Sequence, residues 1–148
     1  MKDKVVIITG GTGALGRYVA DKFAAEGWKI YIPVTSLRKF AELFDNSQDN
    51  NSDFALRKIY AFECDALNEN SVKEFVQKVS ALEKGRIDML VNTVGGFHEF
   101  IDVTMFETPE FYKWFDLNFK PTFYFSREVL KVMKENKYGR IVSIASLA

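Results

Sequence analysis

Three glycines spaced three residues apart follow a short apolar segment near the start of the chain. Residues 4–9 have the composition of a buried strand, and the glycines at 10, 13 and 16 come directly after it. Gly10 permits a tight turn, Gly13 lets a ligand approach the backbone, and Gly16 lets the next helix pack closely on the strand. Backbone N–H groups at the start of a helix bind phosphate when no side chain blocks them. The pattern therefore predicts a pyrophosphate site.

Strand-like and helix-like segments alternate along the whole chain. Apolar runs predict strands at residues 4–9, 29–34, 58–63, 87–91 and 140–145. Helical spacing and capping residues predict helices between them, and we expect Gly27 and Gly85 to end two of these helices. Strands that alternate with helices form a parallel sheet with right-handed crossovers. We therefore expect one α/β domain over residues 1–148, with an open, doubly wound sheet.

The helices after the second and third strands have recognisable starts and apolar faces. Ser36 can cap the first of them, and either Asn68 or Ser71 can begin the other. Residues 45–53, between the short helix and the third strand, read as a polar loop. The residues expected to face inward are Leu37, Phe40, Ala41 and Phe44 in the short helix, and Val72, Phe75, Val76, Val79 and Leu82 in the other.

A long helix is expected over residues 109–136. Its start is marked by the hydroxyl of Thr108 as a cap and by proline at the first helical position. Pro121 cannot donate to the carbonyl of Leu117, so we expect a kink or a local opening there. The helix also carries aromatic side chains, whose spacing favours packing in the core or at a subunit interface over a cofactor site. These are Phe111, Trp114, Phe115, Phe119 and Phe123.

Composition excludes several classes of partner. Lys plus Arg equals Asp plus Glu at 20 each, so charge gives no reason to expect nucleic acid or a membrane surface. No apolar run approaches the roughly 20 residues of a membrane span. Cys64 is a single cysteine after an apolar strand, which predicts a buried thiol and a reducing, cytoplasmic compartment. His98 is expected in a solvated or substrate-contacting loop, and no grouping has metal-ligand spacing.

Five segments together, in order and spacing, resemble the short-chain dehydrogenase/reductase family. The turn Thr9-Gly10-x-x-Gly13-x-x-Gly16 is similar to the family's cofactor turn, although Ala14 stands where the commonest version has its middle glycine. Segment 88–95 is similar to the strand that ends in Asn-Asn-Ala-Gly, with Thr93 and Val94 replacing two of those four residues. Segment 139–146 resembles the strand that delivers the catalytic serine.

The resemblance implies hydride transfer between a nicotinamide cofactor and a carbonyl or alcohol carbon, on a sheet with strand order 3-2-1-4-5. It implies that Asn118 helps hold a proton-relay water and that a serine polarises the carbonyl. Period-two alternation places Ser143 within the last strand and Ser146 just past its end, so Ser146 is our candidate. The acid at 65 matches the position that binds the adenine amino group. Residues expected to contact the cofactor are Gly10, Thr12, Gly13, Leu15, Gly16, Ser36, Arg38, Asp65, Ala66, Asn92 and Gly95.

The sequence departs from the family at its end. The family's Tyr-x-x-x-Lys pair should come about a dozen residues after the serine, and the sequence stops at Ala148. That tyrosine supplies the proton for carbonyl reduction, and the lysine lowers its pKa. We therefore expect a truncated piece of a longer protein, inactive alone. The resemblance also implies a small-molecule substrate and a homo-oligomer formed through helix 109–136.

The residues after the second strand bear on the choice between cofactors. An NAD site usually places an acid there, roughly 20 residues after the glycines, to bind the ribose hydroxyls. This chain has Val34, Thr35 and Ser36 instead, followed by the cations Arg38 and Lys39. Hydroxyls and a cation accept a 2′-phosphate that a carboxylate would repel. We therefore predict that NADP(H) is favoured over NAD(H).

Two other functions remain open at this point. One is a non-catalytic nucleotide-binding module that senses the cofactor or binds a partner over an exposed sheet edge. The other is an extended-type member acting on nucleotide sugars, as an epimerase or dehydratase, which only the glycine spacing supports. A downstream Tyr-x-x-x-Lys pair would favour the dehydrogenase.

Overall fold

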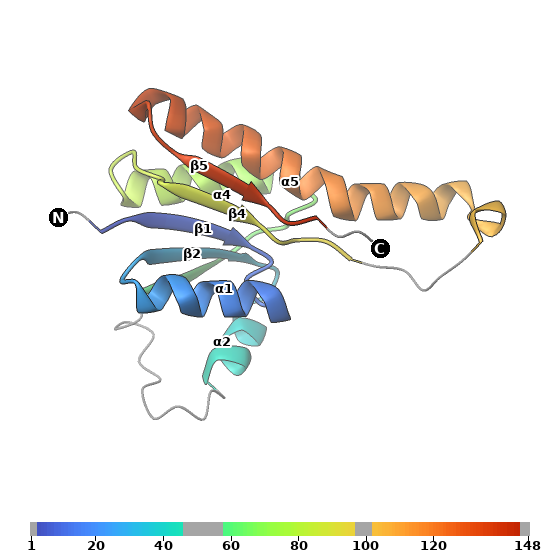
Figure 1. The fold of residues 1–148 in the computed structure, drawn as a ribbon, viewed down its shortest axis with the longest axis horizontal. Coiled ribbons are helices and arrows are strands. Elements are labelled where there is room, and N and C mark those ends of the chain that lie inside the picture. The colour runs from blue at the N-terminus through green and yellow to red at the C-terminus, as the bar shows by residue number, and fades with distance from the viewer. Residues whose placement is uncertain (1–2, 46–57, 97–101, 146–148) are drawn as a thin grey trace.

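Valine and isoleucine dominate the segments that form the central sheet, because branched side chains pack well on a pleated surface. The computed structural model describes residues 3–45, 58–96 and 102–145. Its five parallel strands lie in the order β3-β2-β1-β4-β5, which confirms the predicted order (Figure 1). The strands are β1 (Val5–Thr9), β2 (Lys29–Val34), β3 (Ile59–Glu63), β4 (Met89–Asn92) and β5 (Arg140–Ser143).

Helices cover both faces of this sheet, which gives the doubly wound arrangement (Figure 1). One face carries α1 (Ala14–Ala25) and α2 (Leu37–Asp45), and the other carries α4 (Glu69–Leu82) and α5 (Thr108–Asn136). A short 3-10 helix, η1 (Val103–Met105), precedes α5. Each face buries its own apolar cluster, one around Val6, Ile8 and Phe44 and the other around Val5, Ile7 and Phe75. The central strands β1, β2 and β4 are therefore buried on both sides, as parallel strands usually are, while the edge strands β3 and β5 are partly exposed.

The carboxyl ends of the neighbouring strands β1, β4 and β5 are aligned. Thr9 of β1 is paired with Asn92 of β4, and Asn92 is paired in turn with Ser143 of β5. Loops and side chains that follow these strands are thereby brought to one edge of the sheet. In open α/β sheets this edge is where ligands bind.

Local signals placed most helix ends correctly. Asn68 is the N-cap of α4, where its side chain accepts a hydrogen bond from the Ser71 N–H at 3.1 Å. Ser36 accepts one from the Lys39 N–H at 3.3 Å at the start of α2. Gly27 and Gly85 follow α1 and α4 with φ of 76° and 81°, a left-handed conformation that glycine adopts without strain.

Three predicted inward residues are wrong. Leu37 is 46% exposed and Ala41 is also exposed, because α2 contacts the sheet edge at β3 and only its Phe40–Phe44 stripe reaches the core. Leu82 is 55% exposed because it is the last residue of α4, beyond the contact that buries Val79. The other members of the two predicted sets pack inward.

The start of α5 differs in detail from the prediction. The helix begins at Thr108, one residue before the predicted start, its N-cap is Glu107, and no side chain makes a capping hydrogen bond there. The Thr108 hydroxyl therefore does not cap the helix. The proline occupies the first turn, where a missing N–H costs nothing.

The rest of α5 is one continuous helix with an unusual outer face. Pro121 lies buried inside it. The N-terminal part of α5 extends past the carboxyl ends of the strands (Figure 1). The aromatic side chains on this part are not core residues: Phe111, Phe115, Phe119 and Phe123 are 51%, 45%, 53% and 46% exposed. Trp114, the remaining member of the predicted set, is less exposed than these four phenylalanines.

Candidate functional site

The glycine turn joins β1 to α1 by a backbone that leaves no room for a side chain at Gly10 or Gly16. Gly10 has a φ of +66° and its carbonyl accepts a hydrogen bond from the Gly13 N–H at 2.9 Å. A Cβ at Gly16 would overlap the same Gly10 carbonyl oxygen. A Cβ at Gly13 would stand 3.3 Å from it, tighter than an ordinary contact. Gly10 therefore forms the tight turn predicted for it, and Gly16 allows the predicted close packing of the helix.

The start of α1 presents backbone N–H groups to solvent. The first N–H groups of a helix have no acceptor within the helix, and the N-cap Gly13 has no side chain to satisfy them. Gly13, Ala14 and Leu15 are exposed, and the first turn contains no acidic residue. Thr12 is half-buried beside them. The partial positive charge of the helix start is thus available to an anion such as a diphosphate.

Asp65 shapes the turn that follows β3. Its carboxylate accepts a hydrogen bond from the Leu67 N–H at 2.9 Å, and its own N–H donates to the Ser71 hydroxyl at 3.0 Å. Asp65 remains exposed and Ala66 is half-buried. Asp65 therefore lies at the strand end where its predicted role needs it, with a carboxylate that is both fixed by the turn and open to solvent.

Asn92 is buried at the end of β4, with 2% of its surface exposed. Its amide nitrogen donates to the hydroxyls of Ser126 in α5 and Ser143 in β5, both at 3.2 Å. Its amide oxygen has no hydrogen-bond partner among the described residues. Sequence reasoning missed Ser126, because no local motif marks it and only the packing of α5 on β4 brings it to Asn92.

Asn118 ties α5 to the loop that follows β4. Its side-chain oxygen accepts from the Gly96 N–H at 2.9 Å, and its side-chain nitrogen donates to the Trp114 carbonyl at 2.9 Å. A Cβ at Gly95 would stand 2.8 Å from the Asn118 oxygen, and a Cβ at Gly96 would stand 2.7 Å from a Leu117 methyl. The two glycines therefore let this loop lie directly against the helix.

The residues proposed to distinguish the cofactors lie at the start of α2. The Ser36 hydroxyl accepts the hydrogen bond from the Lys39 N–H described above. Arg38 has a side chain that is 88% exposed, and its guanidinium pairs with Glu42 at 2.9 Å one turn further on. The Arg38 side chain therefore lies along the surface of the helix. Breaking an exposed ion pair of this kind costs little free energy.

Two residues singled out in the sequence lie outside the described parts of the chain. They are Ser146, the candidate catalytic serine, and His98. The polar loop expected at residues 45–53 also lies outside them, except for its first residue, which ends α2.

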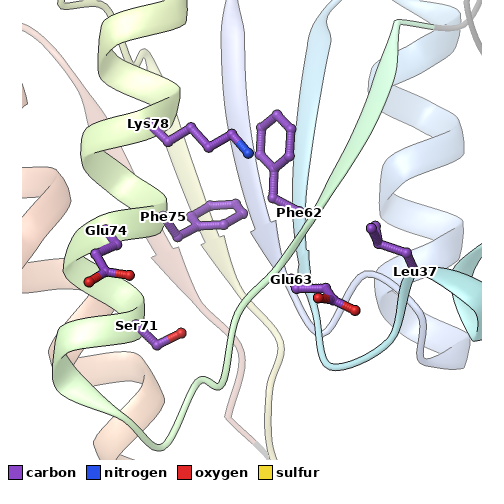
Figure 2. A pocket seen from close by; sticks show the side chains of 7 residues that line it. All are labelled: Leu37, Phe62, Glu63, Ser71, Glu74, Phe75 and Lys78. Carbon is purple, nitrogen blue, oxygen red and sulfur yellow. The ribbon is translucent and has the colours of Figure 1, made fainter.

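A cleft of about 310 Å³ lies on the α4 side of β3 (Figure 2). Phe62, Glu63, Glu74 and Lys78 are among the residues that line it. The Lys78 ammonium lies 3.8 Å from the centre of the Phe62 ring, so a side chain of the protein already covers the aromatic surface. β3 is the sheet edge, two strands away from β1. This cleft is therefore distinct from the glycine turn.

The parallel sheet, the aligned strand ends and the glycine turn define an α/β domain of the Rossmann-like class. Among the described residues, no helix has both the length and the apolar character to cross a bilayer. The chain matches the family model of the short chain dehydrogenases over residues 4–148. It belongs to the short-chain dehydrogenase/reductase family of NAD(P)-binding oxidoreductases.

Individual relatives agree with this assignment. The chain is 34% identical to a 7alpha-hydroxysteroid dehydrogenase of Bacteroides fragilis, over 99% of this chain and 55% of the relative. It is 29% identical to the 3-oxoacyl-[acyl-carrier-protein] reductase FabG of Rickettsia typhi, over 97% and 54%. The chain thus spans about half the length of the curated relatives it matches.

Solved structures show the same fold. The structure of ElxO with NADP bound is 28% identical to this chain, with a TM-score of 0.84, over 99% of this chain and 56% of that one. The crystal structure of gox2181 is 24% identical with a TM-score of 0.86, over 99% and 55%. The second likeness speaks for the fold alone.

Proposed function

We propose that this chain is the cofactor-binding domain, residues 1–148, of a short-chain oxidoreductase, and that its glycine turn binds the diphosphate of NADP(H). The bound dinucleotide would supply or accept a hydride at a carbonyl or alcohol carbon of a small substrate. The relatives named above include one dehydrogenase and one reductase. We propose that the protein to which this chain belongs catalyses a reaction of the same class.

The observation that carries the proposal is the crowding at Gly16. A side chain there would displace the Gly10 carbonyl, and with it the turn that exposes the helix N–H groups. The absence of an N-terminal side-chain cap and of acidic residues in the first turn of α1 adds support, because both would compete with a phosphate. A tight strand-to-helix connection that binds no ligand would not require a helix start without a side-chain cap or without acidic residues.

Asn118 and Ser146 are the catalytic residues we propose. The Asn118 side chain holds the loop and the helix together through Gly96 and Trp114. Because an amide oxygen can accept two hydrogen bonds and its nitrogen can donate two, the same side chain can also help to hold a water. Pro121 has no N–H for the neighbouring Leu117 carbonyl, and this carbonyl is where we place the relay water. Ser146 would polarise the substrate carbonyl.

The residues after β2 support a preference for NADP(H). Positions 35–37 hold Thr35, Ser36 and Leu37, none of which is acidic. Arg38 can exchange Glu42 for a 2′-phosphate, because an exposed ion pair stabilises a protein by only about 0–1 kcal/mol. We also propose a cytoplasmic location, based on the single cysteine, and a homo-oligomer formed through α5.

Calorimetric titration of the 148-residue chain with NADPH and with NADH tests the preference. We expect NADPH to bind more tightly. Arg38→Gln should weaken NADPH binding several-fold and leave NADH binding unchanged, because only NADPH carries the 2′-phosphate. Lys22→Gln, which removes an exposed cation from the last turn of α1, is the control and should change neither. Tighter binding of NADH by the wild-type chain would reject the preference.

A further inference from the structure

Thr93, the first residue after β4, forms a reciprocal pair with Thr9 at the end of β1. The Thr93 hydroxyl donates to the Thr9 carbonyl at 2.6 Å. The Thr93 N–H donates to the Thr9 hydroxyl at 3.2 Å. The last paired residues of the two strands are Thr9 and Asn92, so these bonds continue the connection one residue beyond the ladder. Both threonines are at least partly shielded from solvent, and Thr9 is fully buried.

The pair is built against the first glycine of the turn. A Cβ at Gly10 would stand 2.8 Å from the Thr93 hydroxyl oxygen and 3.1 Å from the Thr93 carbonyl carbon and oxygen. Gly10 also has a φ of +66°, which disfavours any other residue. The end of β4 and the glycine turn therefore touch directly, and Thr93 is the residue on the β4 side of the contact.

The bond to Thr9 constrains the peptide from which the turn begins. The peptide unit between Thr9 and Gly10 is planar, so holding the Thr9 oxygen also fixes the orientation of the Gly10 N–H. The Gly10 carbonyl, one peptide further, accepts from the Gly13 N–H at 2.9 Å and lies against Gly16. A change at Thr93 is thus transmitted through two peptide units to the N–H groups at the start of α1.

We propose that Thr93 is a positioning residue for the glycine turn, and that its hydroxyl presets the backbone for a dinucleotide diphosphate. This inference rests on the proposed cofactor binding. A turn held in its binding geometry before the ligand arrives binds more tightly, because less ordering is left for the binding step. The hydroxyl is the essential group, since the carbonyl of Thr9 needs a donor and a methyl group in its place supplies none.

The test is the affinity of three variants for NADPH, measured by calorimetry together with thermal unfolding. Thr93→Val keeps the size of the side chain but removes the donor, and it should weaken binding about tenfold. Thr93→Ser keeps the donor and should bind like the wild type. Thr104→Val is the matched control, because it removes a hydroxyl bonded to Asp102 at 2.7 Å in η1. It should leave the affinity unchanged.

The outcomes separate this inference from the proposed function. If the wild-type chain binds neither dinucleotide, the proposed function fails and the inference fails with it. If the wild type binds and Thr93→Val binds equally well, the inference is overturned while the function stands. Weak binding by Thr93→Ser would also overturn it, because the hydroxyl would then not be the cause. Should Thr93→Val not fold, Thr93→Ala, which adds no bulk, carries the same expected loss.

Discussion

Several polar side chains at the carboxyl edge of the sheet bond to backbone groups of the loops beside them. Thr93 donates to the Thr9 carbonyl, Asn118 accepts from the Gly96 N–H, and Asp65 accepts from the Leu67 N–H. Each of these bonds fixes a loop that follows a strand. Catalytic and binding residues are carried by such loops, and their precision depends on how firmly the scaffold holds them. These three bonds therefore fix the backbone at this edge of the sheet.

The reactivity of the Cys64 thiol can be used to test its burial. Cys64 is 4% exposed, and burial raises the pKa of its thiol to about 11. We expect the native chain at pH 7.5 to react with a thiol reagent far more slowly than the urea-unfolded chain, since the thiolate is the reactive form. Equal labelling rates in the two states would contradict the burial.

The same shift predicts a pH dependence of stability. Because the folded pKa is raised, the contribution of Cys64 to folding is fully present below the unfolded pKa of about 8.5. It is lost as the pH rises from there towards the folded value of about 11. Cys64→Ala should therefore lose less stability than the wild type between pH 8 and pH 10, as measured by urea unfolding at each pH.

Among the elements, α5 has the feature that most needs an explanation. The rings of Phe111, Phe115, Phe119 and Phe123 are stacked in a row at centroid distances of 6.2, 5.1 and 6.1 Å, and all are about half exposed. Burying one phenylalanine side chain is worth about 2 kcal/mol. A row of four on a helix that extends past the sheet is suited to packing against a second copy of the same helix.

We expect the chain to sediment as a dimer, and Phe115→Arg or Phe119→Arg to make it monomeric, because a buried unpaired charge is costly. Tyr112→Arg is the control, since Tyr112 is 59% exposed on the same helix but lies outside the stacked row. It should leave the dimer intact. A monomeric wild-type chain in analytical ultracentrifugation would contradict the interface.

The elements themselves were largely predictable, because their signals are local. Branched apolar runs marked the strands, and Asn68, Gly27 and Gly85 marked helix ends through short-range hydrogen bonds and a left-handed φ. Which face of a helix is buried depends on where the sheet ends. For that reason Leu37 and Leu82, which have the right spacing but lie beyond the packed surface, were predicted wrongly.

At the scale of the whole molecule, the site depends on contacts between distant parts of the chain. Thr9 meets Thr93 across 84 residues, and Asn92 meets Ser126 and Ser143 across 34 and 51. Spacing along the sequence identified the glycine turn and the strand ends. It could not identify Ser126, or the use of Thr93 as a donor, because these follow from the packing of one element on another.

Binding of a dinucleotide to the glycine turn is the central claim, and one titration tests it most directly. The wild-type chain should bind NADPH with one site per chain in calorimetry. Gly16→Ala should lose most of this affinity, because its Cβ would displace the Gly10 carbonyl. Gly27→Ala should retain it, since that position adds the strain of a positive φ, +76°, away from the turn. Absence of binding by the wild type, or unchanged binding by Gly16→Ala, would contradict the account.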